Sequence, residues 1–559
     1  MTEATPPLVH GAPSTMGDDV PLNVMTLMRH AVRVAPEQEI VHRTGDGGWA
    51  RSSYAATHGR MMRLANALTS LGVAPGDRVG VLDWNSHRHF ECYFALPGMG
   101  AVMLQLNQRL AIEDLAYVVS HGGARFLLVD ETLLPLAEAL APHVPGVAGW
   151  ILMGERPLSE ITTSLTPLFH YEDLLAAADP VFDWPMIDER SAASACYTTG
   201  TTGKPKGVYY SQRSTFLHAY ALATSLGMTL DDCTLFITPL FHGHGWGMPH
   251  AAVLTMNKIV LPGRFTMDET AFLTDTLIRE GVTVTNGAPA IFLPMLRYIE
   301  TLPEKPNFSR LRMLSGASEP PLAMMRGFHE LTGAEVVHAY GATETSPIVT
   351  LNRLKPSLRA RLSQEEQWNL KRKQGLMVPG VEFRVRDAAG RDLPFDGVSV
   401  GEICVRGPWI TTSYHDMPDD GDRFVDGFWR TGDVGSIDPD GYVKVSDRIK
   451  DVVKSGGEWI SSIDMENALV GHPAVLEAAV VGIRHPKWQE RPLALVVLRP
   501  GRTASADELR DHLLAGFAKW QLPDEILFVD RIPRTSVGKL DKKVIRAEHA
   551  DLYAGVVGA

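Results

Sequence analysis

Apolar and polar positions alternate along most of the chain in a way that predicts helices and strands in turn. Leucines and methionines recur at helical spacing over residues 61–71, Gly72 stops the helix, and residues 77–82 follow as a strand. The same order recurs at the apolar runs 127–129 and 282–284. Strands separated by helices are typical of parallel sheets that helices cover. The pattern therefore predicts an α/β fold of stacked, mostly parallel sheets with covering helices.

The pattern changes twice in the second half of the chain. Ser363 to Glu366 has capping-box spacing and opens a charged helix that we expect to end at Gly375. A β-rich region punctuated by glycines follows, from Val378 to about Val445. After Lys450 the pattern predicts a small α+β unit with a helix over 463–469, strands over 475–481 and 495–497, and a helix over 509–517.

These changes predict two domains, as the chain length also requires. A chain of 559 residues is too long for one ordinary hydrophobic core. We expect a large domain over residues 20–447, a hinge at residues 448–450 and a small, mobile C-terminal domain over residues 451–559. Residues 1–19, rich in proline and glycine, are expected to be disordered.

Composition and charge narrow the functional classes. The net charge of −12, without a basic stripe, argues against a nucleic-acid partner. Four scattered cysteines indicate a reducing compartment and no structural zinc. The sequence shows no signal peptide, and no apolar run approaches the roughly 20 residues of a transmembrane helix. We expect a cytoplasmic protein without a transmembrane segment, and a homodimer is left open.

The strongest candidate for chemistry is the stretch from Tyr197 to Gly207, which reads Tyr-Thr-Thr-Gly-Thr-Thr-Gly-Lys-Pro-Lys-Gly. Residues 191–196 before it predict a short buried strand. Glycines let backbone N–H groups face a ligand, threonines add donors and lysines add charge, a combination that suits polyphosphate. Two residues between Gly200 and Gly203 exclude the common P-loop, which has four. A flexible polar loop is the alternative.

This stretch resembles the phosphate loop of the adenylate-forming superfamily, which includes acyl-CoA synthetases, firefly luciferase and peptide-synthetase adenylation domains. Similar signatures follow in the family's order at residues 340–345 (Tyr-Gly-Ala-Thr-Glu-Thr), 429–433 (Trp-Arg-Thr-Gly-Asp), 447–451 (Asp-Arg-Ile-Lys-Asp) and 533–540 (Pro-Arg-Thr-Ser-Val-Gly-Lys-Leu). The resemblance is densest to bacterial medium- and long-chain fatty acyl-CoA synthetases, across residues 454–462, 485–492 and 518–523. Each signature alone also fits an ordinary turn, helix cap or surface lysine.

The resemblance implies a role for each matching residue. Tyr340 would stack on adenine, Thr343 would bind the α-phosphate, and Glu344 would hold Mg²⁺ together with Thr198. Asp433 would bind the ribose hydroxyls, and Arg448 the phosphate or ribose. The other implied nucleotide contacts are Thr199, Gly200, Thr201, Thr202, Gly203, Lys206, Ala317, His338, Ala339, Gly341, Lys450 and Lys454.

The family also implies a change of pose between two half-reactions. The small domain would swing about Lys450, so that Lys539 enters the site for adenylation, where it acts with Thr343 and Glu344 as a catalytic group. In the other pose the site would face the coenzyme A side, formed by Gly456, Gly457 and Trp459. Such a swing would exclude water from the first step and admit a thiol to the second.

The acid pocket is expected in the segment 239–250, at His242, Gly243, His244 and Trp246. In long-chain relatives a tryptophan that matches Trp246 acts as the gate of the acyl tunnel. Three histidines here also have metal-like spacing, but histidines that line a pocket wall and form hydrogen bonds are the stronger interpretation. His242 follows Phe241 where peptide-synthetase domains place an aspartate, which disfavours an amino-acid substrate.

The resemblance therefore predicts an ATP-dependent carboxylic acid:CoA ligase that uses Mg²⁺, ATP and coenzyme A. It would form an acyl adenylate and then an acyl-CoA thioester, most readily from a medium- or long-chain fatty acid. Alternatives are a short, methylthio or aromatic acid, acyl transfer to a carrier protein, luciferase-like oxidation, and a scaffold without catalysis. Retention of Lys539, Glu344 and Asp433 argues against the scaffold.

Overall fold

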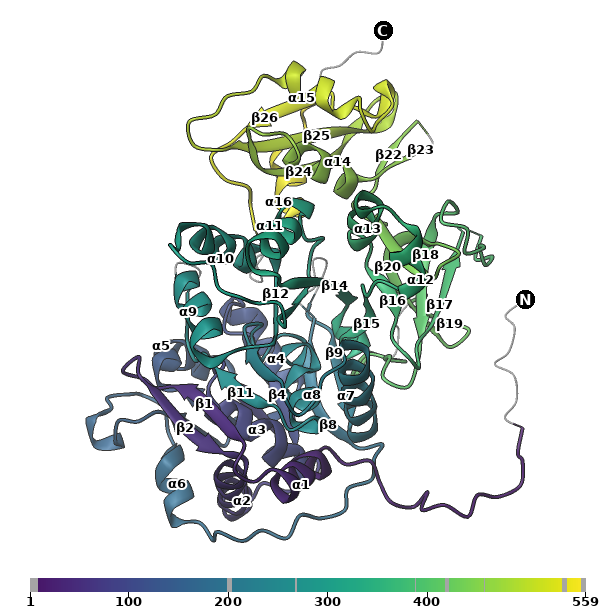
Figure 1. Ribbon diagram of the computed structural model, residues 1–559. Coiled ribbons are helices and arrows are strands. Elements are labelled where there is room, and N and C mark those ends of the chain that lie inside the picture. Colours follow the sequence, from purple (N-terminus) through teal and green to yellow (C-terminus); the bar gives the residue numbers. More distant parts are fainter. Residues whose placement is uncertain are drawn as a thin grey trace. The chain divides into compact units, whose positions relative to one another are not determined.

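The computed structural model describes residues 9–198, 204–266, 269–387, 389–417, 422–456, 458–534 and 540–553, without the side chains of 458 and 459. Contacts divide the chain (Figure 1) into two compact units, Met1–Glu382 with Arg406–Trp429, and Phe383–Val405 with Arg430–Ala559. This division groups part of the β-rich region with the C-terminal residues. The expected domain limits and the hinge at residues 448–450 stay predictions.

The first sheet of the first unit has the strand order β7-β6-β5-β3-β4-β8-β9. All neighbours are parallel except β8 and β9, which form an antiparallel pair. The strands are β3 (Arg78–Leu82), β4 (Val102–Gln105), β5 (Ala124–Asp130), β6 (Gly149–Met153), β7 (Leu168–His170), β8 (Ala192–Tyr197) and β9 (Gly207–Ser211). The helices in this part of the chain are α1 (Val24–Val34), α2 (Tyr54–Ser70), α3 (His87–Gly98), α4 (Ile112–His121), α5 (Leu134–Leu140) and α6 (Tyr171–Ala177).

A second sheet in this unit runs β2-β1-β11-β10-β12-β13-β14-β15-β16. It is parallel from β1 to β14, whereas β2, β15 and β16 run antiparallel to their neighbours. The strands are β1 (Glu39–Arg43), β2 (Trp49–Ser53), β10 (Cys233–Phe236), β11 (Lys258–Leu261), β12 (Val284–Gly287), β13 (Arg312–Ser315), β14 (Glu335–Gly341), β15 (Ile348–Leu351) and β16 (Gly375–Met377). The helices are α7 (Gln212–Leu226), α8 (Met248–Leu254), α9 (Thr270–Glu280), α10 (Pro289–Thr301), α11 (Leu322–Thr332), α12 (Pro356–Arg361) and α13 (Gln364–Lys371).

The predicted α/β fold is confirmed, with two differences at element ends in this unit. The strand expected over 282–284 begins only at Val284. Helix α9 ends in a left-handed cap at Gly281, and the Val282 N–H still donates to the Leu277 carbonyl of that helix, so it is not available for pairing with a strand. The capping box at Ser363 is present, but its helix ends at Lys371, before Gly375. Asn352 donates to the carbonyls of Leu370 and Lys373 and so closes that helix early.

The second unit contains two smaller β-sheets. The first contains most of β17 (Glu382–Arg386), β18 (Gly401–Arg406), β20 (Phe428–Ile437) and β21 (Tyr442–Arg448), in the order β17-β18-β20-β21. The short strand β19 (Phe424–Val425) pairs with the first two residues of β20 and belongs with them to the first unit. The second has the order β23-β22-β25-β24, with β26 beside β25. Its elements are β22 (Val453–Ser455), β23 (Glu458–Ile460), α14 (Ser462–Val470), β24 (Val475–His485), β25 (Gln489–Leu498), α15 (Ala506–Leu513), β26 (Glu525–Phe528) and α16 (Lys542–Glu548).

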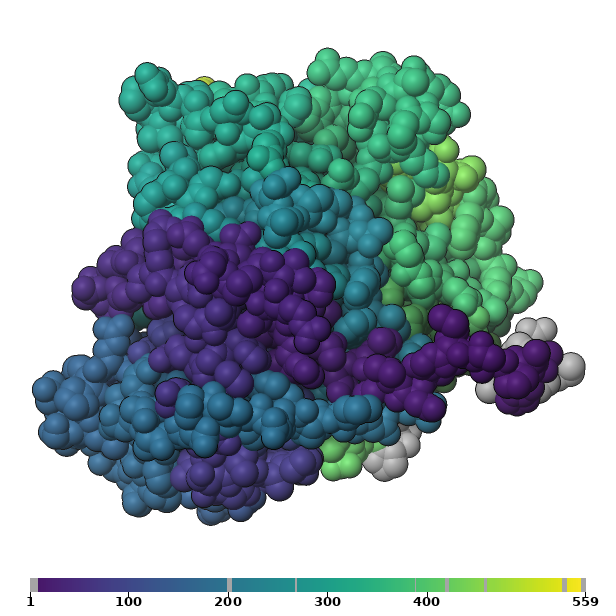
Figure 2. All heavy atoms as spheres, turned by 60° about the horizontal axis from the view of Figure 1, so that its bottom comes forward, coloured from purple at the N-terminus to yellow at the C-terminus, as the bar shows by residue number. Residues whose placement is uncertain are grey.

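The predicted α+β unit after Lys450 is confirmed, although its last predicted helix is displaced. That helix runs over Ala506–Leu513 instead of 509–517, because the Ser505 side chain caps it in a box with Glu508. Residues 9–22 form neither helix nor strand, and Figure 2 shows the purple N-terminal segment on the outside of the molecule. Within the described part of the chain, no helix has the length and hydropathy needed to cross a bilayer.

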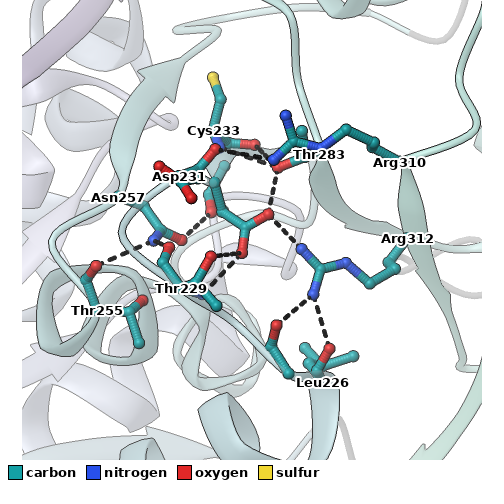
Figure 3. Close-up of polar contacts among 12 residues, drawn as sticks. Leu226, Thr229, Asp231, Cys233, Thr255, Asn257, Thr283, Arg310 and Arg312 are labelled. Atoms are coloured by element: carbon teal, nitrogen blue, oxygen red, sulfur yellow. Dashed lines mark hydrogen bonds and ion pairs between the residues drawn. The ribbon is translucent and has the colours of Figure 1, made fainter.

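A polar network joins the amino ends of strands β10, β12 and β13 in the second sheet to the C-terminal end of helix α7 (Figure 3). Asp232, directly before β10, accepts hydrogen bonds from the Thr283 hydroxyl at 2.6 Å and the Thr229 N–H at 2.8 Å, and it pairs with Arg312. Arg312 also donates to the Leu226 and Gly227 carbonyls at 2.8 and 2.7 Å. These carbonyls belong to the end of α7, where no intrahelical donor remains.

Electrostatics make this network pH-dependent. Burial alone would raise the pKa of Asp232, but the hydrogen bonds from Thr283 and Thr229 and the Arg312 guanidinium hold that pKa below its usual range. A carboxyl whose pKa is lower in the folded chain stabilises it above the pKa of the unfolded state, and this contribution is lost as the pH falls through the folded-state pKa.

We expect Asp232→Asn to destabilise the first unit by on the order of 3 kcal/mol at pH 7, because it leaves the half-buried Arg312 charge without its partner. The difference from the native chain should shrink below about pH 4, where the native carboxyl takes up its proton too. Denaturation midpoints across this pH range measure the effect. Asp231→Asn, at an exposed neighbour, is the control. Equal midpoints for both variants would show that the network is not stabilising.

Candidate active site

The base of the candidate phosphate loop is held by the hairpin β8–β9. Tyr197, the last residue of β8, pairs with Gly207, the first of β9. The Thr198 N–H donates to the Lys206 carbonyl at 2.9 Å, and the Lys206 N–H donates to the Thr198 hydroxyl at 3.2 Å. A Cβ at Gly207 would lie 2.8 Å from the Tyr197 ring, so this position needs glycine. Predicted contacts Thr199, Gly200, Thr201, Thr202 and Gly203 lie outside the described residues.

Both lysines of this stretch lie over tyrosine rings. The Lys206 ammonium is 4.5 Å from the centroid of the Tyr414 ring, and the Lys204 ammonium is 4.7 Å from that of Tyr117. The negative face of an aromatic ring attracts a cation but carries no net charge that would neutralise it. Among the described residues, neither lysine forms an ion pair with a carboxylate.

Glu344 lies in a short turn, Thr343–Thr345, that follows β14. Its carboxylate Oε1 accepts a hydrogen bond from the Tyr414 hydroxyl at 2.8 Å, and its backbone carbonyl accepts one from the Thr411 N–H at 2.8 Å. The Tyr210 hydroxyl donates to the Thr343 carbonyl at 2.5 Å. The turn is therefore held from two sides, by β9 and by the segment that contains Tyr414.

Strand β14 carries the predicted adenine-binding residues at its end. His338 and Ala339 are buried, and Tyr340 is half-buried. His338 bonds the Arg372 carbonyl at 2.9 Å, and burial lowers its pKa to about 4, which keeps the ring neutral. A Cβ at Gly341 would lie 1.8 Å from the Pro347 carbonyl oxygen, so no other residue fits there.

The predicted acid-pocket residues form a left-handed turn, Gly243–Gly247. Every residue in it has a positive φ, including His244 at 53° and Trp246 at 60°. Such angles are costly for residues other than glycine and persist where the surroundings fix them. Here the Asn286 side-chain amide, buried in β12, donates to the Gly245 carbonyl at 2.9 Å.

Trp246 connects this turn to the predicted adenine site. A Cβ at Gly316 would lie 3.1 Å from the Trp246 ring and 3.0 Å from the Ala339 carbonyl oxygen. Ala317, a predicted nucleotide contact, follows with φ of 69°. The glycine thus allows the indole, β14 and the Ala317 backbone to lie close together.

His244 is buried with its imidazole among aromatic rings. Its ring centroid is 4.5 Å from that of Tyr210 and 6.1 Å from that of Tyr93. Within the described residues, neither ring nitrogen has a hydrogen-bond partner. Burial, and then the nearby His250, hold the pKa of His244 well below its usual value, so the ring is neutral. It offers one donor and one acceptor. His242, two residues earlier, is half-buried and lines a small cavity with Cys196 and Phe241.

A second group of predicted residues lies in the second unit. Asp433 and Arg448 face each other in the β20–β21 ladder, and their side chains form an ion pair at 3.3 Å. Burial and Arg448 lower the pKa of nearby Lys450. Lys454 lies in β22. Two residues later, the Gly456 N–H donates to the Trp488 carbonyl at 2.9 Å. Gly457, the Trp459 side chain and Lys539 lie outside the described residues.

The structure thus brings Thr198, Lys206, Thr343 and Glu344 together around two tyrosines that sequence reasoning missed. Tyr210 follows the loop in β9, and Tyr414 lies in a polar segment before β19. Neither position shows a sequence signal beyond an aromatic residue near a turn. Their importance depends on contacts 133 and 70 residues away along the chain.

Two family models match the chain. Residues 28–415 match the AMP-binding enzyme model, and residues 464–539 match the AMP-binding enzyme C-terminal domain model.

Several characterised proteins are similar over nearly the whole length. A long-chain-fatty-acid–CoA ligase of Thermus thermophilus is 44% identical over 97% of this chain and 98% of its own. A 3-methylmercaptopropionyl-CoA ligase of Ruegeria lacuscaerulensis is 40% identical over 96% and 98%. A medium-chain-fatty-acid–CoA ligase of Ectopseudomonas oleovorans is 37% identical over 95% and 96%.

Solved structures share the fold. The anthranilate CoA ligase AuaEII, in complex with anthranoyl-AMP, superposes with a TM-score of 0.82 at 24% identity, over 97% of this chain and 100% of that one. The o-succinylbenzoate CoA synthetase MenE from Bacillus subtilis, in complex with ATP and magnesium ion, has a TM-score of 0.76 at 25% identity, over 92% and 98%. With its two matching models and near-full-length relatives, the chain belongs to the AMP-binding enzyme family.

Proposed function

We propose that this ATP-dependent acid:CoA ligase activates a medium- or long-chain fatty acid. Two near-full-length relatives carry fatty-acid–CoA ligase names. The observation that supports this substrate is the group of buried apolar side chains at the left-handed turn, Phe241, Trp246 and Met248. Buried apolar side chains suit an alkyl chain, since each methylene removed from water contributes about 0.8 kcal/mol.

In the first half-reaction an oxygen of the acid carboxylate attacks the α-phosphorus of ATP. The bond from that phosphorus to the bridging oxygen breaks, and pyrophosphate leaves with the electron pair. We propose that the Lys206 ammonium and the Thr198 hydroxyl bind the departing phosphates, and the bond from the Lys206 N–H to that hydroxyl supports this role for both residues. We assign Thr343 to the α-phosphate and Lys539 to the carboxylate and α-phosphate.

The residues present fit a magnesium ion. Glu344 and Thr198 would hold it through a carboxylate and a hydroxyl, both hard oxygen donors, and Mg²⁺ takes one or two carboxylates plus substrate phosphates in many nucleotide sites. Among the described residues no group of three His, Cys, Asp or Glu side chains forms a richer metal site. When bound, the ion supplies positive charge to the phosphate oxygens.

In the second half-reaction the coenzyme A sulfur gives its proton to solvent water and attacks the acyl carbonyl carbon. The bond from that carbon to the phosphate oxygen breaks, and AMP leaves with the electron pair. We propose that Asp433, with Arg448, binds the ribose and that Gly456, Gly457 and Trp459 lie on the coenzyme A side. The swing about Lys450, the cytoplasmic location and a homodimer stay predictions.

A second candidate substrate is a short acid with a polar or sulfur-bearing tail. His244 favours it, because its buried imidazole has a donor and an acceptor to offer. One relative carries the name of a 3-methylmercaptopropionyl-CoA ligase.

Release of AMP and pyrophosphate across a panel of acids, with and without coenzyme A, tests the proposal. We expect continuous release of AMP and pyrophosphate only when coenzyme A is present. We also expect kcat/KM to rise by up to roughly fourfold for each added methylene through the medium-chain acids. A carrier-protein function would be indicated by acyl adenylate that accumulates even when coenzyme A is present.

His244→Ala separates the two substrate classes. For a pocket built for alkyl chains, we expect the variant to keep or improve kcat/KM on long straight-chain acids, because a polar group is removed from the wall. The same variant should lose activity on 3-methylmercaptopropionate if the imidazole binds its tail. Loss of most activity on every straight-chain acid would contradict the fatty-acid proposal.

Lys539→Ala tests the two-pose scheme. Removing a donor aimed at developing charge should slow adenylation by on the order of 10²–10³. Thioester formation from synthetic acyl adenylate should stay near the native rate, since Lys539 is assigned to the first pose only. Equal loss in both half-reactions would refute this assignment.

A further inference from the structure

Tyr414 lies outside every sequence signature of the predicted site. It belongs to the segment between β18 and β19, and its side chain is buried at 5% exposure. Its hydroxyl donates to Glu344 Oε1 at 2.8 Å, and Trp429 Nε1 donates to the same hydroxyl oxygen at 3.3 Å. The ring also carries the Lys206 ammonium on its face, 4.5 Å from the centroid.

The hydrogen-bond direction in this group is determined by chemistry. An indole N–H can only donate, so the Tyr414 oxygen accepts from Trp429 and its single hydrogen is directed to Glu344. A hydrogen bond to a charged acceptor is short and directional, and it fixes the plane of the carboxylate.

The ring has a separate effect on the phosphate loop. A lysine has four rotatable side-chain bonds and loses much freedom when it is held in one place. The Tyr414 face draws the Lys206 ammonium to one side of the loop base, where Thr198 also lies. One side chain thus contacts both the predicted metal carboxylate and the predicted phosphate lysine.

We propose that Tyr414 is a positioning residue for Mg-ATP, whose hydroxyl orients Glu344 toward the metal and whose ring orients Lys206 toward the phosphates. This inference rests on the proposed function, because it takes Glu344 as a metal ligand. Packing alone does not account for the residue. A phenylalanine would fill the same space but would lack the hydrogen bonds to Glu344 and Trp429.

Tyr414→Phe tests the role of the hydroxyl, with Tyr209→Phe as the matched control. Tyr209 is half-buried in β9, directly before Tyr210, and its hydroxyl donates to the Gly122 carbonyl at 3.3 Å instead of to Glu344. Titration of Mg²⁺ into each variant with ATP, followed by calorimetry and by the ATP-induced rise in melting temperature, measures metal-dependent binding without catalysis. Kinetics then separate KM for Mg-ATP, KM for the acid and kcat.

We expect Tyr414→Phe to raise the Mg²⁺ concentration for half-maximal ATP binding roughly tenfold, the effect of losing one hydrogen bond to a charged group. KM for the acid and the melting temperature without ligand should stay near those of the native chain, and Tyr209→Phe should match the native chain throughout. In a Glu344→Gln background, Tyr414→Phe should add little, because both changes act on the same group.

Additive shifts in the double variant, or an Mg²⁺ dependence of Tyr414→Phe equal to that of Tyr209→Phe, would overturn the proposal. So would an unchanged Mg²⁺ dependence in Glu344→Gln, since Tyr414 would then orient a carboxylate that holds no metal. Absence of turnover on every acid would refute the proposed function instead, and the binding titration would still decide the role of Tyr414. If Tyr414→Phe does not fold, Trp429→Phe, which removes the donor to the hydroxyl, is expected to shift the Mg²⁺ dependence in the same direction.

Discussion

A polyphosphate and its metal must meet charged groups that are already in place, because ordering those groups during the reaction would cost part of the binding energy. In this chain the constraint is met at one buried tyrosine. Glu344 is held by the Tyr414 hydroxyl, Lys206 lies on its ring, and Thr198 is bonded to Lys206 through the backbone. One side chain therefore contacts both the carboxylate and the ammonium group of the predicted site.

The backbone around the site obeys a second constraint, which is close approach. Gly207, Gly316 and Gly341 each lie where a Cβ would meet a neighbour at 3.1 Å or less. The Gly243–Gly247 turn adds a run of positive φ angles that places the Trp246 indole against Gly316. These positions bring the predicted acid-binding turn next to the strand end that carries the predicted adenine contacts. A carboxylate and an α-phosphate need such proximity if one is to attack the other.

Much of this could be predicted from the sequence, because the signals are local. Periodicity located α2 and β3, and the order of motifs indicated the loop, the Glu344 turn and the ligase family. Element ends were less predictable, since tertiary partners set them: Asn352 ends α13, and Ser505 starts α15 earlier than the apolar spacing indicates. Tyr414 and the Asp232–Arg312 pair could not be predicted, because their partners lie 70 and 80 residues away along the chain.

The central claim is that Thr198 and Glu344, with Lys206 beside them, form the metal and phosphate site of an acid:CoA ligase. Anomalous diffraction from a crystal grown with Mn²⁺ and a non-hydrolysable ATP analogue tests it most directly. The account predicts a metal peak about 2.1 Å from a Glu344 carboxylate oxygen and from the Thr198 hydroxyl, with a phosphate next to the Lys206 ammonium. A metal peak bound to other side chains, or phosphates held away from Lys206, would contradict it.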